Sequence, residues 1–288
     1  MKKITIIIAT IFVLALVATC LAGCGLVYAG DFHITNHTVA EFNSINIDTD
    51  ITDIEIKVDN NAEYGVVCYE TDKIAYIVRV DNNTLYISSK APNLNLIGVT
   101  KTPKVTVYLK ESQYNNLYID TDTGKISVAK NISFDMVELS SDTGSIEYNA
   151  TVTNKLIAET DTGKIKIDGI GNCNSVKLDS DTGAISTSNF VTKSLNIDLD
   201  TGKTTISNVK ADEVSVSSST GDVELDRLES LNILIITDTG DVRGTVVGPL
   251  NFVVTSDTGS TSVPENEVGG LCKISTNTGD VRITRYVE

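Results

Sequence analysis

The chain has 288 residues, of which 41% are hydrophobic and 6% aromatic, and it contains no Trp. Its 38 Asp and Glu outnumber its 23 Lys and Arg, so its formal net charge is −15 at pH 7. This acidic balance argues against nucleic-acid binding, which needs basic residues to neutralise phosphate, and against electrostatic docking onto anionic lipid.

The N-terminus has the pattern of an export signal. Met1-Lys2-Lys3 is a basic start, residues 4–17 are apolar, and Leu21-Ala22-Gly23-Cys24 matches a lipobox. Cleavage of a lipoprotein-type signal over 1–24 would leave Cys24 lipidated, which is the favoured interpretation. The alternative is an uncleaved transmembrane anchor over 4–29, which is long enough to cross a bilayer. Both place the remainder on the extracytoplasmic face of a membrane, at the bacterial cell surface.

Two less regular regions come next. Residues 25–40 are expected to form a linker in which His33 and His37 are exposed. Residues 41–115 are strand-like but irregular, and they predict an N-terminal β cap, because the end of a solenoid needs protection against edge pairing. Lys104–Leu109 is a half-buried strand that leads into the repeats.

Residues 116–288 repeat one pattern: a hydrophobic pair, a hydroxyl residue, Asp-Thr-Gly and a second hydrophobic pair. The glycine recurs every 19 or 20 residues. So regular a period over so long a stretch is typical of stacked coils. The repeat glycines, which we expect at structural turns, are Gly124, Gly144, Gly163, Gly183, Gly202, Gly221, Gly240, Gly259 and Gly279.

The apolar positions of each repeat predict strands. Positions seven and five before the glycine and two after it are mostly apolar, and a spacing of two is strand periodicity. Another apolar residue, seven to nine positions after the glycine, predicts a third inward strut. These residues are Ile132, Val152, Ile170, Phe190, Val209, Leu228, Val247 and Val268.

We therefore predict an all-β fold: a parallel β-solenoid of 19–20-residue coils with a less regular N-terminal β cap, after an N-terminal apolar helix. Stacked coils share one core that no single repeat could bury. At the interstrand spacing of about 4.8 Å, the coils would form a rod of roughly 50–60 Å. A β-propeller is disfavoured, because four strands per blade need about twice this period.

Asp-Thr-Gly is also the catalytic triplet of aspartic proteases, which need two carboxylates sharing a proton. A catalytic pair has no reason to be copied through the repeats, where Ser219 and Asn277 also replace the aspartate. These replacements indicate turn capping, because Ser, Asn and Asp make the same side-chain-to-backbone bond. The glycine would supply the positive φ of a tight corner. The repeated aspartates are Asp122, Asp142, Asp161, Asp181, Asp200, Asp238 and Asp257.

Two other hypotheses apply to this corner. Stacked carboxylates repel one another, and calcium between coils would relieve the repulsion, so the seven aspartates are calcium candidates, joined by Asp120, Glu159, Asp179 and Asp198. A solvated row of caps is the favoured interpretation, with no metal expected. The threonines between Asp and Gly could form an ice-binding array, but such arrays need two columns on a flat strand and these lie in a turn.

No other constellation in the sequence carries chemistry. The five cysteines, Cys20, Cys24, Cys68, Cys173 and Cys272, show no CxxC or Cys-His spacing, so a zinc site is not expected. Cys272 occupies an apolar repeat position, and a disulfide between Cys68 and Cys173 is left open. With two His, no P-loop and no dinucleotide fingerprint, we expect neither an enzyme nor a cofactor.

The pattern as a whole resembles a known family. The apolar N-terminus, the start Gly30-Asp31-Phe32, the strand Lys104–Leu109 and the repeated Thr/Ser-Asp-Thr-Gly-x-Ile units are similar to bacterial β-strand-repeat surface proteins named "putative adhesin", a domain of unknown function. The resemblance covers residues 40–288. It implies a β-solenoid outside the membrane and, in some members, a link to envelope-stress sensing; it supplies no catalytic residues.

The sequence thus predicts a non-catalytic, membrane-tethered surface protein that serves as an adhesion or binding scaffold. Solenoids offer extended binding surfaces, and here the outward residues vary while the inward ones stay apolar. The expected partners are the membrane at the N-terminus and a protein or a cell-wall or surface polysaccharide, with no nucleic acid. The alternative is an envelope-stress or regulatory component acting with a neighbouring membrane protein, and a calcium-stabilised solenoid ranks below both.

Mass spectrometry of the native N-terminus distinguishes the two tethers. We expect a diacylated Cys24, and the Cys24→Ser variant should keep its signal, because the lipidated cysteine directs cleavage. An intact Met1 on the wild-type chain would establish the transmembrane anchor instead.

Overall fold

The computed structural model describes residues 31–62, 65–71, 74–89 and 102–287. These residues form strands without a helix, which confirms the all-β class. None of this described part could cross a membrane as a helix, and the predicted apolar helix and Cys24 lie outside it. The strands are β1 (His33–His37), β2 (Ser44–Ile51), β3 (Asp53–Val58), β4 (Val66–Glu70), β5 (Tyr76–Asp81), β6 (Thr84–Ser89), β7 (Lys104–Leu109), β8 (Gln113–Thr123), β9 (Ile126–Val128), β10 (Ser133–Thr143), β11 (Ile146–Tyr148), β12 (Thr151–Thr220), β13 (Val223–Thr239), β14 (Val242–Val247), β15 (Leu250–Thr258), β16 (Thr261–Ser262), β17 (Gly270–Thr278) and β18 (Val281–Arg285).

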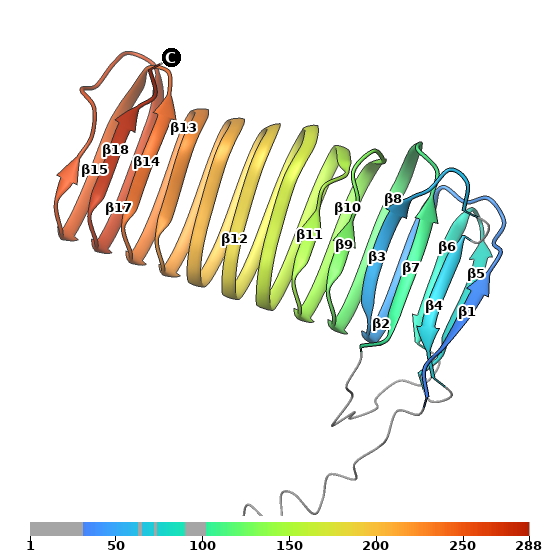
Figure 1. Cartoon of the computed structure of the whole chain (residues 1–288). Coiled ribbons are helices and arrows are strands. Elements are labelled where there is room, and N and C mark those ends of the chain that lie inside the picture. The colour runs from blue at the N-terminus through green and yellow to red at the C-terminus, as the bar shows by residue number, and fades with distance from the viewer. Residues whose placement is uncertain (1–30, 63–64, 72–73, 90–101, 288) are drawn as a thin grey trace, which may run out of the picture.

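The strands form a solenoid whose coils stack along one axis (Figure 1). β10 pairs in parallel with β8 on one side and with the start of β12 on the other, with equivalent repeat residues opposite each other. β12 runs for 70 residues because its ladders continue through several whole coils. Equivalent residues therefore line up in columns along the rod.

The inward columns form one core. Residues such as Leu117, Ile119 and Ile126 are at most 1% exposed, as the period-two pattern predicts. Tyr148 and Phe134 are the largest fully buried side chains. The columns of β-branched and Leu residues stay dry because each is covered by the same column of the coils above and below.

The repeat glycines bring backbone onto backbone at one corner. A Cβ on Gly183 would lie 1.6 Å from the carbonyl oxygen of Gly163, and a Cβ on any of seven other repeat glycines would lie within 2.1 Å of a neighbouring glycine carbonyl oxygen. Only some have positive φ, and Gly144, Gly163 and Gly183 do not. Close approach, which every one of them shares, is therefore the general reason for glycine, whereas the predicted positive φ holds for six of the nine.

The residue before the aspartate position is Ser or Thr in eight repeats and Leu199 in the other, and it points inward beside this corner in most of them. Ser141 Oγ donates to the carbonyl of Gly124 at 3.2 Å, and Thr160 Oγ1 donates to that of Gly144 at 3.2 Å. These bonds join a coil to the glycine of the preceding coil and satisfy a buried hydroxyl, whereas the equivalent hydroxyls of Ser180, Ser218 and Thr237 are buried without a hydrogen-bond partner.

At both ends the coils do not stack in chain order. The coil of β2 and β3 lies between that of β6 and β7 and that of β8 and β9. At the C-terminal end, β17 lies between β13 and β15, and β18 lies between β14 and β16. The strand β7, expected to lead into the repeats, pairs with β3 and β4 instead. Each inserted coil gains a ladder on both sides.

Three local predictions were wrong. Residues His33–His37, placed in a linker, form β1, antiparallel to β4. Val247 is only partly buried, because a register shift between β13 and β14 puts Val246 opposite Leu228 and into the core column. Val268 is fully exposed in the segment between β16 and β17.

Gly183→Ala is expected to lower the free energy of unfolding by about 3 kcal/mol, because the added Cβ meets a backbone carbonyl that the ladders hold in place. Gly169→Ala is the matched control: its φ is +67° and its Cβ would meet open space, so it should cost about 1 kcal/mol. Urea unfolding of both variants measures the difference, and equal losses would show that conformation and not contact selects glycine.

Candidate functional site

The structure places the seven Asp-Thr-Gly aspartates in one exposed column. In the described part of the chain, no backbone amide donates to any of their carboxylates; the contact within the column runs from Asn277 Nδ2 to Asp238 Oδ1 at 3.3 Å. The predicted capping role of these side chains is therefore wrong. The threonines beside them are exposed as well.

Backbone amides at this corner are capped instead by the residue that follows the repeat glycine, three positions after the Asp of Asp-Thr-Gly. Asp222 Oδ1 accepts the amide of Asp241 at 3.0 Å, Asp241 Oδ1 accepts that of Asp280 at 2.9 Å, and Asp280 Oδ1 accepts that of Ser260 at 2.7 Å. These bonds bridge adjacent coils near the C-terminal end. The repeat pattern does not predict these bonds, because the residue after the repeat glycine varies among Lys, Ser, Ala and Asp.

Neighbouring carboxylates repel the charge of Asp122. Partial burial, followed by the charges of Asp50, Asp142, Asp120 and Asp48, raises the pKa of Asp122. Across the described residues, His, Cys, Asp and Glu side chains do not converge in threes in a way that could hold a metal ion. The calcium hypothesis thus has no formed site in this part of the chain.

A second outward face carries paired charges along the short strands after the glycines. Glu147 lies between Lys125 and Lys166, at 3.0 and 3.2 Å, and hydrogen bonds from these lysines hold its pKa below the usual value. Exposed pairs of this kind contribute about 0–1 kcal/mol each. The same arrangement recurs at Lys203, Glu224 and Arg243.

The third side of the coils turns through a left-handed corner. Asn131, Asn189 and Asn208 have φ of 53–67°, and Gly169 has φ of 67°. Asn and Gly suit this conformation, which costs other residues roughly 1–2 kcal/mol. Arg227 occupies the equivalent position with φ of 52°. Arg227 is therefore a residue type that this left-handed backbone conformation disfavours, whereas Asn or Gly occupies the equivalent position in these other coils.

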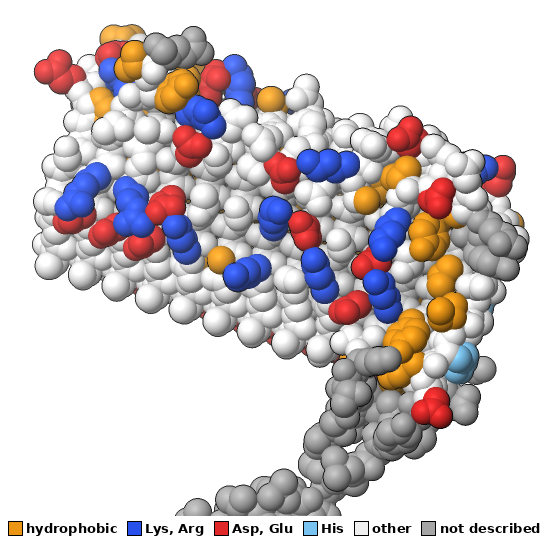
Figure 2. Space-filling model, viewed as in Figure 1, with side chains coloured by type: hydrophobic (Ala, Val, Ile, Leu, Met, Phe, Trp, Pro, Cys, Tyr) orange, Lys and Arg blue, Asp and Glu red, His pale blue; other side chains and the backbone are white. Residues whose placement is uncertain are grey.

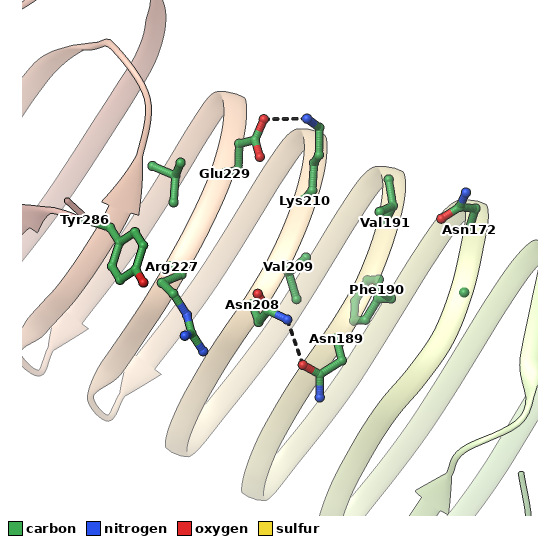
Figure 3. A pocket seen from close by; sticks show the side chains of 12 residues that line it. Asn172, Asn189, Phe190, Val191, Asn208, Val209, Lys210, Arg227, Glu229 and Tyr286 are labelled. Atoms are coloured by element: carbon green, nitrogen blue, oxygen red, sulfur yellow. Dashed lines mark hydrogen bonds and ion pairs between the residues drawn. The ribbon is translucent and has the colours of Figure 1, made fainter. Parts of the chain in front are cut away.

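A groove of about 650 Å³ lies beside this corner (Figure 3). Side chains of several successive coils point into it, so it runs across the coils rather than along one strand. It is lined by Gly171, Asn172, Asn189, Phe190, Val191, Asn208, Val209, Lys210, Arg227, Glu229, Val247 and Tyr286.

Polar contacts order the walls of the groove. Asn208 Nδ2 donates to Asn189 Oδ1 at 2.9 Å, and Asn189 Nδ2 donates to Asp168 Oδ1 at 2.7 Å. Lys210 Nζ pairs with Glu229 at 2.5 Å on the opposite wall (Figure 3). Asp168, Asn189 and Asn208 thus join three successive coils in one row of donors and acceptors.

Arg227 and Tyr286 close the C-terminal end of the groove. The Arg227 guanidinium lies 5.7 Å from the centroid of the Tyr286 ring, within cation–π range. Its backbone amide donates to Thr245 Oγ1 at 2.8 Å, and its nearest carboxylate is Asp226 at 3.3 Å. Tyr286 stays 39% exposed. The end of the groove thus offers a cation and an aromatic face.

The described cysteines belong to the core. Cys68, Cys173 and Cys272 are free and buried, so the open question of a Cys68–Cys173 disulfide is answered in the negative. Burial raises the pKa of Cys68 and of Cys272 to about 12, which leaves the thiols inert. Cys272 fills an apolar position, as predicted.

A rod of stacked coils with a groove across one side defines a β-solenoid repeat protein. The chain belongs to the Toastrack DUF4097 family, whose model matches residues 42–202 and 171–287. Among solved structures, an adhesin candidate from Parabacteroides merdae is 12% identical with a TM-score of 0.51, covering 88% of this chain and 97% of that one. One from Bacteroides fragilis is 14% identical with a TM-score of 0.48 and the same coverage. No curated protein matches the chain.

Sequence reasoning did not find the groove. Its signal was present as an Asn or Gly six or seven positions after several repeat glycines, with Arg227 as the departure. Asp-Thr-Gly is a longer and more regular motif than this single Asn or Gly, and it therefore dominates the repeat pattern. Tyr286 had no signal, because its place depends on the order of coils at the C-terminal end.

Asp122→Ala is expected to leave the free energy of unfolding at pH 7 unchanged or slightly higher, because it removes repulsion and no hydrogen bond. Since the repulsion acts on the ionised form, any gain should vanish as the pH falls through the raised pKa of Asp122 and the ordinary aspartate value. Asp241→Ala should cost about 1 kcal/mol, because the amide of Asp280 loses its acceptor. Urea unfolding compares the two, and a matching loss in Asp122→Ala would restore its capping role.

Millimolar calcium is expected to leave the thermal midpoint of unfolding unchanged, because the described carboxylates do not converge on a site. Scans with calcium and with a chelator measure this. A higher midpoint in calcium that Asp142→Asn abolishes would establish an ion between coils.

Proposed function

We propose that this chain is a non-catalytic binding protein, tethered through its N-terminus to the extracytoplasmic face of a membrane, whose groove binds a segment of cell-wall or surface polysaccharide. The observation that carries the proposal is Arg227, a cation held in a left-handed corner where neighbouring coils use Asn or Gly. The site therefore keeps a residue that its backbone disfavours.

Backbone strain of this kind points to function when the surroundings impose it. The structure around Arg227 does so through the bond from its amide to Thr245 and the ring of Tyr286 beside its guanidinium. An Asn would suit the same backbone at lower cost. Only the guanidinium, with its planar set of donors, is lost in that exchange.

The chemistry of the groove fits a sugar chain. Amides of Asn172 and Asn208, together with the Lys210–Glu229 pair, offer donors and acceptors for hydroxyl groups. The exposed ring of Tyr286 offers an apolar face for a pyranose ring. An open groove that crosses several coils suits an extended polymer better than a compact ligand.

The position of the groove agrees with a tethered rod. Its walls come from β12, β13, β14 and the C-terminal end, whereas β1, the first described strand, lies at the opposite end of the solenoid (Figure 1). A tether at the N-terminus would hold one end at the membrane and display the groove away from it. The adhesin-like fold neighbours support a surface role of this type.

Arg227→Asn is expected to weaken binding of cell-wall polysaccharide roughly tenfold, because a charged hydrogen-bond donor is lost. Its free energy of unfolding should be equal or higher by about 1 kcal/mol, because Asn suits the left-handed corner. Binding to a fractionated cell-wall glycan series, measured by calorimetry, checks the first result, and urea unfolding the second.

Arg282→Asn is the matched control, since it removes an arginine from the charged face without touching the groove. It should bind like the wild type. Equal binding by Arg227→Asn and the wild type, or no binding of any glycan fraction by the wild type, would reject the groove as a polysaccharide site.

A further inference from the structure

The N-terminal end of the solenoid carries an apolar patch on the outward side of β1, β4 and β7. We define the N-terminal apolar patch as Phe32, Ile34, Val67, Tyr69 and Tyr108. Ile34 lies opposite Tyr69 in the β1–β4 ladder, and Tyr69 lies opposite Lys104 in the β4–β7 ladder. Paired residues in a sheet point to the same side, so these side chains share one surface.

The other side of these strands faces the core, which fixes the orientation of the patch. Cys68, Val105 and Val107, which alternate with patch positions, are 0% exposed. Ile34 by contrast is 65% exposed. Phe32 stacks on Tyr69 with ring centroids 4.5 Å apart and planes 8° apart. The patch is thus a preformed, partly aromatic surface.

The N-terminal apolar patch differs in polarity from the rest of the solenoid face on which it lies. The ladders β7–β3, β3–β9 and β9–β11 continue the same surface along the rod, where its outward residues are charged or small, such as Glu147 and Lys166. Figure 2 shows apolar side chains gathered at the N-terminal end, Lys, Arg, Asp and Glu along the middle, and a second apolar group at the upper left, at the C-terminal end. On the face that continues β1, β4 and β7, apolar side chains give way to charged ones beyond the N-terminal end.

The chain places this end next to its membrane segment. Phe32 follows Ala29, the last residue of the apolar stretch 4–29, by three positions, a reach of about 10 Å. From Cys24 the reach is about 28 Å. Under either form of the tether, the patch lies within reach of the bilayer surface.

We propose that the N-terminal apolar patch seats in the headgroup region of the bilayer to which the chain is tethered, so that the solenoid stands in a fixed orientation; this inference rests on the tether in the proposed function. Tyr favours this region because it combines an apolar ring with a polar hydroxyl, and Phe32 and Ile34 add apolar surface that interfacial burial removes from water. Lys57 and Lys104 flank the patch, and their stems can lie along the apolar surface while their charges stay in water.

The charges around the N-terminal apolar patch favour a bilayer of neutral lipid over one of anionic lipid. Glu55 pairs with Lys57 at 2.6 Å and with Lys104 at 2.7 Å, so two lysines share one carboxylate. The rim carries little net charge, and the chain as a whole is strongly acidic. The attraction is therefore interfacial burial of apolar surface and not recognition of anionic headgroups.

The absence of Trp from the sequence allows a single-reporter test. The full chain with Tyr69→Trp is reconstituted into phosphatidylcholine vesicles whose acyl chains are brominated close to the headgroup. We expect strong loss of its fluorescence relative to unbrominated vesicles. Tyr286→Trp, at the far end of the solenoid, is the matched control and should lose none.

A second variant tests the patch itself. Adding Ile34→Ser to Tyr69→Trp should bring the quenching down toward the level of the control, while the unfolding midpoint stays unchanged because Ile34 is exposed. Iodide in the aqueous phase gives the complementary readout, since a seated Tyr69→Trp is shielded from it.

Three outcomes would overturn the proposal. Vesicle flotation without quenching of Tyr69→Trp would show a tethered chain whose patch stays in water. Shielding from iodide without quenching by brominated lipid would show that a second copy or another protein covers the patch. A chain that does not float with the vesicles would refute the tether of the proposed function, and the patch with it.

Discussion

The contact between a corner glycine and the carbonyl of the next coil sets the rest of this structure. Because nothing larger than hydrogen fits there, the backbone of one coil rests on that of the next, as at Gly183 and Gly163. This contact holds every coil in the same register, so each repeat position becomes a column. The dry core, the paired charges around Glu147 and the row of amides in the groove are all columns of this kind.

The exchange of coil order at the C-terminal end completes the groove. The coil that ends in β18 is inserted beside β14, and the amide of Tyr286 donates to the carbonyl of Val246 at 2.9 Å. That position brings the Tyr286 ring to Arg227. Had the coils stacked in chain order, the coil of β15 and β16 would lie between them, about 4.8 Å thick. A change of topology thus supplies the aromatic wall of the groove.

The two ends of the rod differ in chemistry, in accord with a division of tasks. The N-terminal end closes with antiparallel strands and an apolar, partly aromatic surface. The other half carries the groove, with its amides and a strained arginine. Between them lies a face of ion pairs, such as those of Glu147 with Lys125 and Lys166.

The sequence by itself determined the coil. Its period of 19 or 20 residues and its spacing of two fixed the strands, the inward columns such as Leu117 and Ile119, and the role of Cys272, because these depend only on local alternation and on identical neighbours. Tertiary structure decided which coil lies beside which. The order in which the coils stack rests on contacts between segments far apart in the chain. No sequence period therefore predicts the strand β1, the burial of Val246, the caps at Asp222 and Asp241, or the contact of Arg227 with Tyr286. The candidate site lies where the columns depart from their repeat, and a repeat pattern cannot predict its own exceptions.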